Sequence, residues 1–346
     1  MTVKILIVGF GNVGQGLAEL LVEKERMLRE KYKTDVQVVG IVTRHWGAIV
    51  DEHGLALSRV LASVLAGKGF AHSGYDLQSQ TTAELIENLD YDVLIELTIT
   101  DLNNGEPATQ YIRLALERGR SVITTNKGPI ALHLKELETL AKTHHAVLKY
   151  EGTVMSGTPV LNLIEHNLAG LEIRKIEGIV NGSSNYILTR MEEGLEYDDA
   201  VKEARELGYL EADASADLDG WDAVAKVMIL AGVAFGVTLK VDEVQRRGIA
   251  GLTRREVEDA LGQNKVWRQV VELEWGEQEG CLRAAKAGLR LLGNGHPLAQ
   301  IKGAGNGLVI YTDVMPLITV SGPGAGRRET GYAVLNDLLS ICTEQC

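Results

Sequence analysis

Short apolar runs alternate with helix-like patterns over the first 150 residues. Runs rich in Val, Ile and Leu, each the length of one strand, occur at residues 3–8, 36–42, 93–98, 121–124 and 146–150. Between them, apolar residues recur at the three-to-four-residue spacing of an amphipathic helix. Buried strands that alternate with helices predict a parallel sheet covered on both faces, the doubly wound or Rossmann-type α/β fold.

The rhythm changes after Tyr150. Helical and strand patterns are then mixed, at residues 160–168, 173–180, 197–207, 308–311 and 317–320. This mixture indicates a second domain of the α+β class. Residues 253–299 combine charged segments with glycines and define no clear element. We therefore expect one domain at residues 1–149, completed by residues 321–346, and a second domain at residues 150–320.

The composition of the chain limits the kinds of molecule that it can bind. The chain has 346 residues, a formal net charge of −12 and a pI near 5.2, which argues against nucleic acid or an anionic membrane as a partner and favours a small molecule. No apolar run is long enough to span a bilayer, and because the N-terminus runs straight into a strand pattern we expect no signal peptide. Three cysteines form neither a disulfide framework nor a zinc pattern, so we expect a cytoplasmic protein.

A glycine motif follows the first strand directly. Strand, Gly-x-Gly-x-x-Gly and helix in this order predict a dinucleotide site. Gly9 would permit the tight turn, Gly11 would let the pyrophosphate approach the backbone, and Gly14 would let helix and strand pack closely. The expected cofactor residues of this loop are Gly9, Phe10, Gly11, Asn12, Val13 and Gly14. Residues 1–149 are therefore interpreted as a dinucleotide-binding domain.

Three further residues lie where such sheets bind ligands. The second strand ends in Arg44 instead of the acidic residue that contacts the ribose when NAD is preferred. Arg44 can pair with a 2′-phosphate, so we expect NADP, with NAD as the alternative; a solvated surface arginine is the competing interpretation. Thr98 and Lys127 follow later strands, at the carboxyl edge of the predicted sheet.

An acidic loop leads into a buried helix. Its carboxylates are Glu211, Asp213, Asp217, Asp219 and Asp222, and Lys226 is the only cation before an uncharged apolar run at residues 227–239. Asp222 and Lys226 are four residues apart and share a helix face. A buried lysine needs a partner and is suited to proton transfer. The competing interpretation is an ordinary helix start, with Asp217 or Asp219 as N-cap and a structural Asp222–Lys226 pair.

Six motifs in this chain resemble those of the homoserine dehydrogenase family, in the same order. They lie at residues 9–14, 126–129, 150–154, 181–186, 207–226 and 322–326. The resemblance covers most of the chain apart from residues 230–305. It implies an enzyme of threonine and methionine biosynthesis that interconverts L-homoserine and L-aspartate 4-semialdehyde with a nicotinamide cofactor. The second domain would then bind substrate and form a homodimer.

The resemblance also implies roles for single residues. Lys226 would move the proton of the substrate oxygen, and Lys127 would assist. The implied substrate contacts are Glu211, Asp217, Asp222, Tyr209, Gly182 and Ser183. The implied cofactor contacts, in addition to the glycine loop, are Arg44, Thr98, Lys127 and Gly326.

Two further properties follow from the same resemblance. The family holds a sodium-like monovalent cation by backbone groups, which here would belong to Glu151, Val154, Ser156 and Thr158. Met155 and Ser156 stand where the family has small residues or glycine. Many members add a C-terminal regulatory domain, whereas this sequence ends with a helix pattern at residues 330–342 and resembles the short form.

Two other functions compete with this interpretation. One is an oxidoreductase of the same fold that acts on another small amino acid or oxo acid, such as an aspartate dehydrogenase. It should lack the combination of Glu211, Asp222 and Lys226, which is present. The other is a non-catalytic NADP-binding regulator, which would tolerate the loss of Lys127 and Lys226; both are present.

Overall fold

The structure, a computed structural model, describes residues 1–210, 214–276, 278 and 280–344. Its contacts divide the chain into two units, one formed by Met1–Gly157 with Gly326–Cys346 and the other by Thr158–Ala325. The sequence pattern placed these divisions after residue 149 and after residue 320. The loop at residues 150–157 therefore packs with unit 1, and the loop at residues 321–325 packs with unit 2.

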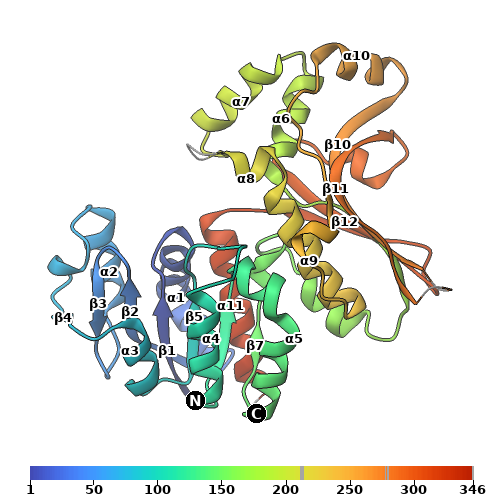
Figure 1. Ribbon diagram of the computed structural model, residues 1–346. Helices are drawn as coiled ribbons and strands as arrows, with labels where there is room; N and C mark the ends of the chain where they lie inside the picture. Colours follow the sequence, from blue (N-terminus) through green and yellow to red (C-terminus); the bar gives the residue numbers. More distant parts are fainter. Residues whose placement is uncertain (211–213, 277, 279, 345–346) are drawn as a thin grey trace. The chain divides into compact units, whose positions relative to one another are not determined.

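Unit 1 is built on a seven-stranded sheet in the order β4-β3-β2-β1-β5-β6-β7 (Figure 1). Its strands are β1 (Thr2–Val8), β2 (Asp35–Thr43), β3 (Gly47–Val50), β4 (Leu77–Gln78), β5 (Val93–Glu96), β6 (Ser121–Thr124) and β7 (Leu148–Lys149). The five strands expected from sequence run parallel, which confirms the doubly wound fold. The sequence did not reveal β3 and β4, two short strands that pair antiparallel at the β2 edge.

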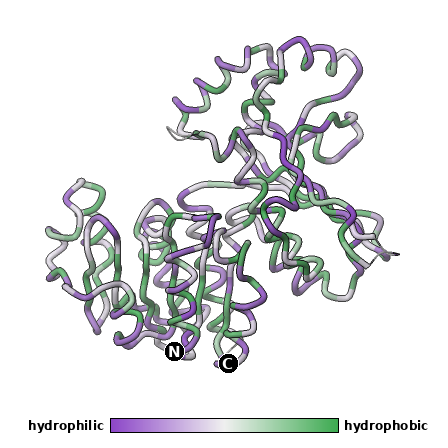
Figure 2. Tube along the Cα trace, in the orientation of Figure 1, coloured by the Kyte–Doolittle hydropathy of each residue, from purple (hydrophilic) through white to green (hydrophobic). Residues whose placement is uncertain are grey.

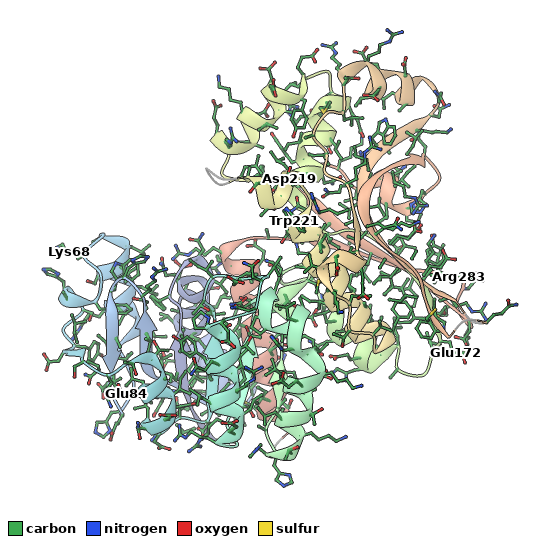
Figure 3. All side chains as sticks on the ribbon, viewed as in Figure 1. Lys68, Glu84, Glu172, Asp219, Trp221 and Arg283 are labelled. Carbon is green, nitrogen blue, oxygen red and sulfur yellow. The ribbon has the colours of Figure 1, made fainter. Side chains whose placement is uncertain are left out.

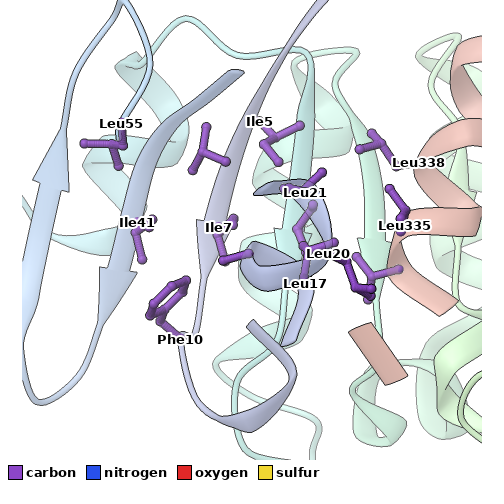
Figure 4. Close-up of a cluster of buried hydrophobic side chains, with 14 of the residues drawn as sticks. Ile5, Ile7, Phe10, Leu17, Leu20, Leu21, Ile41, Leu55, Leu335 and Leu338 are labelled. Carbon is purple, nitrogen blue, oxygen red and sulfur yellow. The ribbon is translucent and has the colours of Figure 1, made fainter. Parts of the chain in front are cut away.

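Two helical layers cover this sheet. Buried residues of α1 (Asn12–Glu30), α2 (Leu57–Leu65) and α11 (Arg327–Glu344) join Ile5 and Ile7 of β1 in one core, of which Figure 4 shows part. Leu6 and Val8 face the opposite core, with α3 (Thr82–Asn88), α4 (Ala108–Glu117) and α5 (Lys127–Thr143). The period-two alternation along β1 thus supplies both cores. A 3₁₀ turn at Phe70–His72 and another at Glu151–Thr153 complete the unit.

Close contact between α1 and α11 joins the two separated parts of unit 1. A Cβ on Gly16 would lie 2.1 Å from the Arg327 carbonyl oxygen, and a Cβ on Gly331 would lie 2.7 Å from the Leu17 nitrogen. Glycine at both positions therefore lets the two helix backbones touch. Arg327 and Arg328 of α11 also pair with Glu19 and Glu23 of α1. The final helix is an integral part of the sheet's covering layer.

Capping side chains determine two helix starts in unit 1. α5 begins at Lys127 because Asn126 caps it and accepts a hydrogen bond from the Gly128 amide. Pro129 lies in the first turn, where backbone N–H groups have no intrahelical acceptor, so its missing N–H costs no hydrogen bond. α3 is capped by Thr81, whose hydroxyl and backbone form a capping box with Glu84.

Unit 2 combines helices with a six-stranded sheet in the order β13-β12-β8-β10-β11-β9. Its strands are β8 (Ile173–Ile179), β9 (Gln245–Arg246), β10 (Lys265–Gly276), β11 (Cys281–Gly293), β12 (Gly305–Thr312) and β13 (Ile318–Pro323). Its helices are α6 (Gly182–Glu192), α7 (Tyr197–Glu206), α8 (Ser215–Leu218), α9 (Trp221–Phe235) and α10 (Arg254–Gly262), with 3₁₀ turns at Val241–Glu243 and Pro297–Gln300. This architecture confirms the expected α+β class.

Two features of unit 2 differ from expectation. Residues 253–299, for which the sequence indicated no element, contain α10 and the long antiparallel hairpin β10–β11. The helix expected at residues 160–168 is largely a π-helical segment, Leu163–Asn167. Figure 2 shows the contrast between apolar α9 and the hydrophilic helices α7 and α10. No helix in the described part of the chain is long and apolar enough to cross a membrane.

A buried carboxylate, Glu177 of β8, anchors one face of the unit 2 sheet. Its side chain is 2% exposed and accepts hydrogen bonds from Lys175 at 2.9 Å, His296 at 2.9 Å and Tyr311 at 2.8 Å, and from Arg290. Burial acts to raise the pKa of Glu177, but the hydrogen bonds from these four donors outweigh it and lower the pKa to about 2. The carboxylate is therefore strongly stabilised in its charged form.

This cluster predicts a loss of stability in acid. Because the pKa of Glu177 is lowered from 4.5 to about 2, its stabilisation is complete above pH 4.5 and is lost as the pH falls to 2. The shift corresponds to about 3 kcal/mol at most. We expect chemical unfolding, followed by circular dichroism between pH 6 and pH 2, to show a flatter pH dependence in Glu177→Gln. Equal pH dependence in both proteins would contradict this.

Candidate active site

Lys226 lies in the middle of α9, whose residues 223–231 are all buried. Its side chain is 9% exposed, and its Nζ donates to Asp222 Oδ2 at 2.7 Å and to the Val180 carbonyl oxygen at 2.5 Å. The Asp222 side chain is itself 14% exposed, so this is a buried pair and not a solvated pair on a helix surface. An ammonium carries three hydrogens, and these two contacts use two of them.

Asn181 joins this pair to a second carboxylate. Its Nδ2 donates to Asp217 Oδ1 at 2.6 Å and to Asp222 Oδ2 at 2.9 Å. Its Oδ1 accepts a hydrogen bond from the Ser184 amide and so caps α6. One carboxamide therefore fixes two acids and a helix start at the same point. The sequence placed Asn181 within the motif at residues 181–186 but indicated no role for it.

Three other expected substrate residues adjoin this cluster within unit 2. Ser183 donates from its hydroxyl to the Tyr209 carbonyl oxygen at 2.6 Å. A Cβ on Gly182 would lie 2.7 Å from the Ala304 carbonyl oxygen, so this position has no room for a side chain. Tyr209 is 42% exposed, and its ring lies 4.8 Å from that of Tyr186. Gly182 and Ser183 directly follow Asn181, and Ser183 connects them to the backbone of Tyr209. Glu211 lies outside the described residues.

The start of α9 differs from the competing interpretation of this segment as an ordinary helix start. Its N-cap is Gly220, in the left-handed conformation with φ of 86°, and not Asp217 or Asp219. Asp217 belongs to the preceding short helix α8, which leaves its carboxylate available to Asn181. Figure 3 labels Asp219 and Trp221 at this junction. The guanidinium of Arg246, in β9, lies 3.9 Å from the centre of the Trp221 ring, and this cation–π contact connects the start of α9 to the sheet.

The glycine loop of unit 1 has the geometry that its motif predicts. Gly9 has φ of 100°, and a Cβ there would lie 2.5 Å from the Leu97 carbonyl oxygen. A Cβ on Gly14 would lie 2.7 Å from the Gly9 carbonyl oxygen, so the helix packs directly on the loop. A Cβ on Gly11 would meet nothing within 4 Å. Gly11 is the N-cap of α1, where backbone amides point outward and favour an anion.

The other expected cofactor residues lie at three places in unit 1. Arg44 is exposed in the turn between β2 and β3. Thr98 follows β5, and Lys127 is the first residue of α5 and not part of the loop before it. Gly326 immediately precedes α11. Thr98 and Lys127 therefore belong to the carboxyl ends of neighbouring parallel strands, β5 and β6.

The loop expected to hold a cation is buried and has an unusual backbone. Glu151, Val154, Ser156 and Thr158 are at most 7% exposed. Met155 and Ser156 have φ of 58° and 55°, the left-handed region that residues with side chains rarely adopt. The Ser156 hydroxyl lies 2.7 Å from that of Thr330, which ties this part of the loop to α11. Among the described residues, no group of His, Cys, Asp and Glu could hold a metal ion through side chains.

Comparison with known proteins identifies the family of this fold and site. A protein-family model described as homoserine dehydrogenase matches residues 159–339, and one described as the NAD binding domain of homoserine dehydrogenase matches residues 9–151. The chain belongs to the homoserine dehydrogenase family. It is therefore an NAD(P)-dependent oxidoreductase of amino-acid biosynthesis that acts on a CH–OH group and interconverts L-homoserine and L-aspartate 4-semialdehyde.

Individual homoserine dehydrogenases resemble the chain over its whole length. The NAD(+)-dependent homoserine dehydrogenase of Pseudomonas canavaninivorans is 40% identical over 98% of this chain and 96% of its own. A putative homoserine dehydrogenase from Archaeoglobus fulgidus has a TM-score of 0.87 at 36% identity, covering 98% and 99% of the two chains. A hyperthermophilic archaeal homoserine dehydrogenase solved with NADPH has a TM-score of 0.83 at 32% identity, covering 100% and 99%.

Proposed function

We propose that Lys226 is the group that moves the proton in this homoserine dehydrogenase. The observation that supports this is a buried ammonium with two hydrogens bound to Asp222 and Val180 and a third hydrogen left for a substrate oxygen. A bound nicotinamide would supply hydride to the aldehyde carbon, or accept it from the alcohol carbon. During reduction Lys226 donates a proton to the developing alkoxide, and during oxidation it takes that proton back. A positioned acid or base of this kind contributes about 10²–10⁴-fold.

The carboxylates beside Lys226 suit an amino-acid substrate. An α-ammonium group that enters a partly buried site needs a negative partner, and Asp217 and Asp222 are held there by Asn181. We assign the substrate's ammonium and hydroxyl ends to these acids together with Glu211, which lies outside the described residues. Tyr209, Gly182 and Ser183 would form the wall of this site. Lys127 would assist the proton transfer.

The cofactor proposal rests on unit 1. The glycine loop at residues 9–14 would receive the pyrophosphate at the start of α1, with Thr98, Lys127 and Gly326 as further contacts. Exposed Arg44 lies in the turn after β2, and β2 ends in Thr43 with no acidic side chain to bind the ribose hydroxyls. This supports a preference for NADP. Among the relatives, one is named NAD(+)-dependent and another was solved with NADPH.

An absorbance assay at the nicotinamide band tests substrate and cofactor together. We expect oxidation of homoserine but not of aspartate or malate, with a lower KM for NADP than for NAD. Arg44→Ala should raise the KM for NADP about tenfold, because it removes a charge-assisted hydrogen bond, and should leave the KM for NAD unchanged. Arg255→Ala, an exposed arginine of α10, is the control. An unchanged KM for NADP in Arg44→Ala would refute the preference.

Three remaining properties follow the family resemblance. A sodium-like cation bound by backbone groups of Glu151, Val154, Ser156 and Thr158 agrees with the buried loop and with the strained backbone at Met155 and Ser156. We also propose a homodimer paired through unit 2, as the family resemblance implies. A cytoplasmic location agrees with the small number of cysteines and with the exposed thiol of Cys281.

A further inference from the structure

Glu96, the last residue of β5, is a buried acid that no step above uses. Its side chain is completely buried. Oε1 accepts hydrogen bonds from the Thr98 amide at 2.8 Å and from the Thr98 hydroxyl, and Oε2 accepts one from the Thr124 hydroxyl at 2.8 Å. Both carboxylate oxygens are therefore occupied by residues that follow or end neighbouring strands, β5 and β6.

Asn126 closes these contacts into a ring. Its backbone amide donates to the Thr124 hydroxyl at 3.0 Å, and its side-chain Nδ2 lies 3.3 Å from both the hydroxyl and the carbonyl oxygen of Thr98. Its Oδ1 accepts from the Gly128 amide at 3.1 Å and so caps α5. We call Glu96, Thr98, Thr124 and Asn126 the carboxyl-edge ring. Lys127 follows the last member of this ring directly.

The carboxyl-edge ring lies where an open sheet receives its ligand. After β1 the chain adds β2, β3 and β4 on one side of this strand, and then β5, β6 and β7 on the other side. The strand order therefore reverses between β1 and β5, which is the topological switch point of the sheet. Ligands of such sheets bind outside the carboxyl ends of the strands at this point. Gly9 of the cofactor loop packs against the same turn, since a Cβ on Gly9 would lie 3.0 Å from the Thr98 nitrogen.

Glu96 is a costly way to stabilise a strand end. A completely buried carboxylate loses its hydration, and the partners of Glu96 are hydroxyls and an amide rather than a lysine or arginine. What a carboxylate provides here is two adjacent acceptors that fix two separate turns at once. A role in positioning residues at the carboxyl edge of the sheet explains this arrangement better than a role in stabilising the strand.

We propose that Glu96 is a positioning residue that holds Thr98 and Lys127 in place for the nicotinamide end of the cofactor. This rests on the proposed function, in which Thr98 and Lys127 contact the cofactor. The adenine end depends instead on the glycine loop and Arg44. Loss of Glu96 therefore weakens binding of the whole dinucleotide but not of a fragment that lacks nicotinamide.

The variants Glu96→Gln and Thr124→Val test this proposal. Glutamine keeps the shape of the Glu96 side chain but replaces one acceptor oxygen with an NH₂ group. Valine removes the Thr124 hydroxyl that donates a hydrogen bond to Glu96 Oε2. Thr124→Ser keeps that hydroxyl, so its dissociation constants and kcat should equal those of the wild type. The matched control is Ser121→Ala at the opposite end of β6, a buried serine that accepts a hydrogen bond from the Val147 amide. It removes a buried hydrogen bond from the same strand but lies away from the carboxyl edge.

Dissociation constants are measured by titration with NADPH and with 2′-phospho-ADP-ribose, which lacks nicotinamide. We expect Glu96→Gln and Thr124→Val to raise the constant for NADPH about tenfold, to lower kcat for homoserine by a similar factor, and to leave the constant for the fragment unchanged. Equal weakening of both ligands, or values equal to those of Ser121→Ala, would overturn the proposal. If the wild-type protein bound neither NADPH nor the fragment, the proposed NADP site itself would be refuted, which is a different outcome from a selective change in NADPH binding.

Discussion

Lys226→Met is expected to lower kcat for homoserine oxidation about a thousandfold, within the range that a positioned acid or base supplies. Methionine keeps most of the apolar stem in the packed interior of α9, so the change removes the ammonium without a large cavity. The cofactor contacts in unit 1 are unaffected, so the dissociation constant for NADPH should stay within twofold. Steady-state kinetics and NADPH titration together check this result.

A second variant separates proton transfer from charge alone. Lys226→Arg retains a positive charge beside Asp222, but a guanidinium does not release its proton at neutral pH, so kcat should stay low. Lys202→Met, at an exposed position of α7 in the same unit, is the control for the loss of one lysine. Turnover of Lys226→Met within tenfold of the wild type would rule out the role assigned to Lys226, whatever the effect on stability.

The fold of unit 1 followed from sequence because its determinants are local. The strand at residues 3–8 has an uninterrupted apolar pattern, and burial of Ile5 and Leu6 on opposite faces confirms what that pattern indicated. The glycine loop was equally predictable, since Gly9 and Gly14 meet backbone atoms of their immediate neighbourhood. The short strands β3 and β4 were missed because two to four residues give no period that a pattern can reveal.

The hairpin β10–β11 was missed because its burial does not alternate cleanly. Arg268 and Gln269 are both buried within β10, so a polar side chain is buried on each face of the strand. Arg268 is accommodated because it pairs with Glu192 of α6 and donates to the Ala299 carbonyl oxygen at 3.2 Å. Both partners are distant in sequence, 76 and 31 residues away. A contact of this kind depends on the folded chain and leaves no local signal.

The sequence indicated the chemical groups of the site better than the residues that hold them. Lys226 stood out as a single cation in an apolar helix. Asn126 and Asn181 each cap a helix, and the sequence assigned neither of them a role of its own, although Asn181 also bridges two carboxylates. Glu96 offered one signal, a charged residue at the end of an otherwise apolar strand. Residues that act through two or more distant partners are the ones that a linear pattern conceals.

Asp222→Asn is expected to lower kcat/KM about a hundredfold and the free energy of unfolding by about 3 kcal/mol, because it leaves the buried Lys226 ammonium without a negative partner. The substitution keeps the shape of the side chain, so packing of α9 is preserved. Asp219→Asn, an exposed acid three residues earlier, is the matched control and should change neither quantity. Kinetics and urea unfolding measured on the same preparations check both effects.

The double variant Asp222→Asn/Lys226→Met decides whether the lost stability comes from an unpaired charge. Removing one partner of a buried pair is costly, whereas removing both leaves no charge to compensate. The double variant should therefore be more stable than Asp222→Asn alone, by about 1–3 kcal/mol, although it lacks activity. If the losses in free energy of unfolding of the two single variants simply added up in the double variant, water or another group would already compensate the charge of Lys226. In that case the buried Asp222–Lys226 pair could not be the feature that prepares the ammonium for proton transfer.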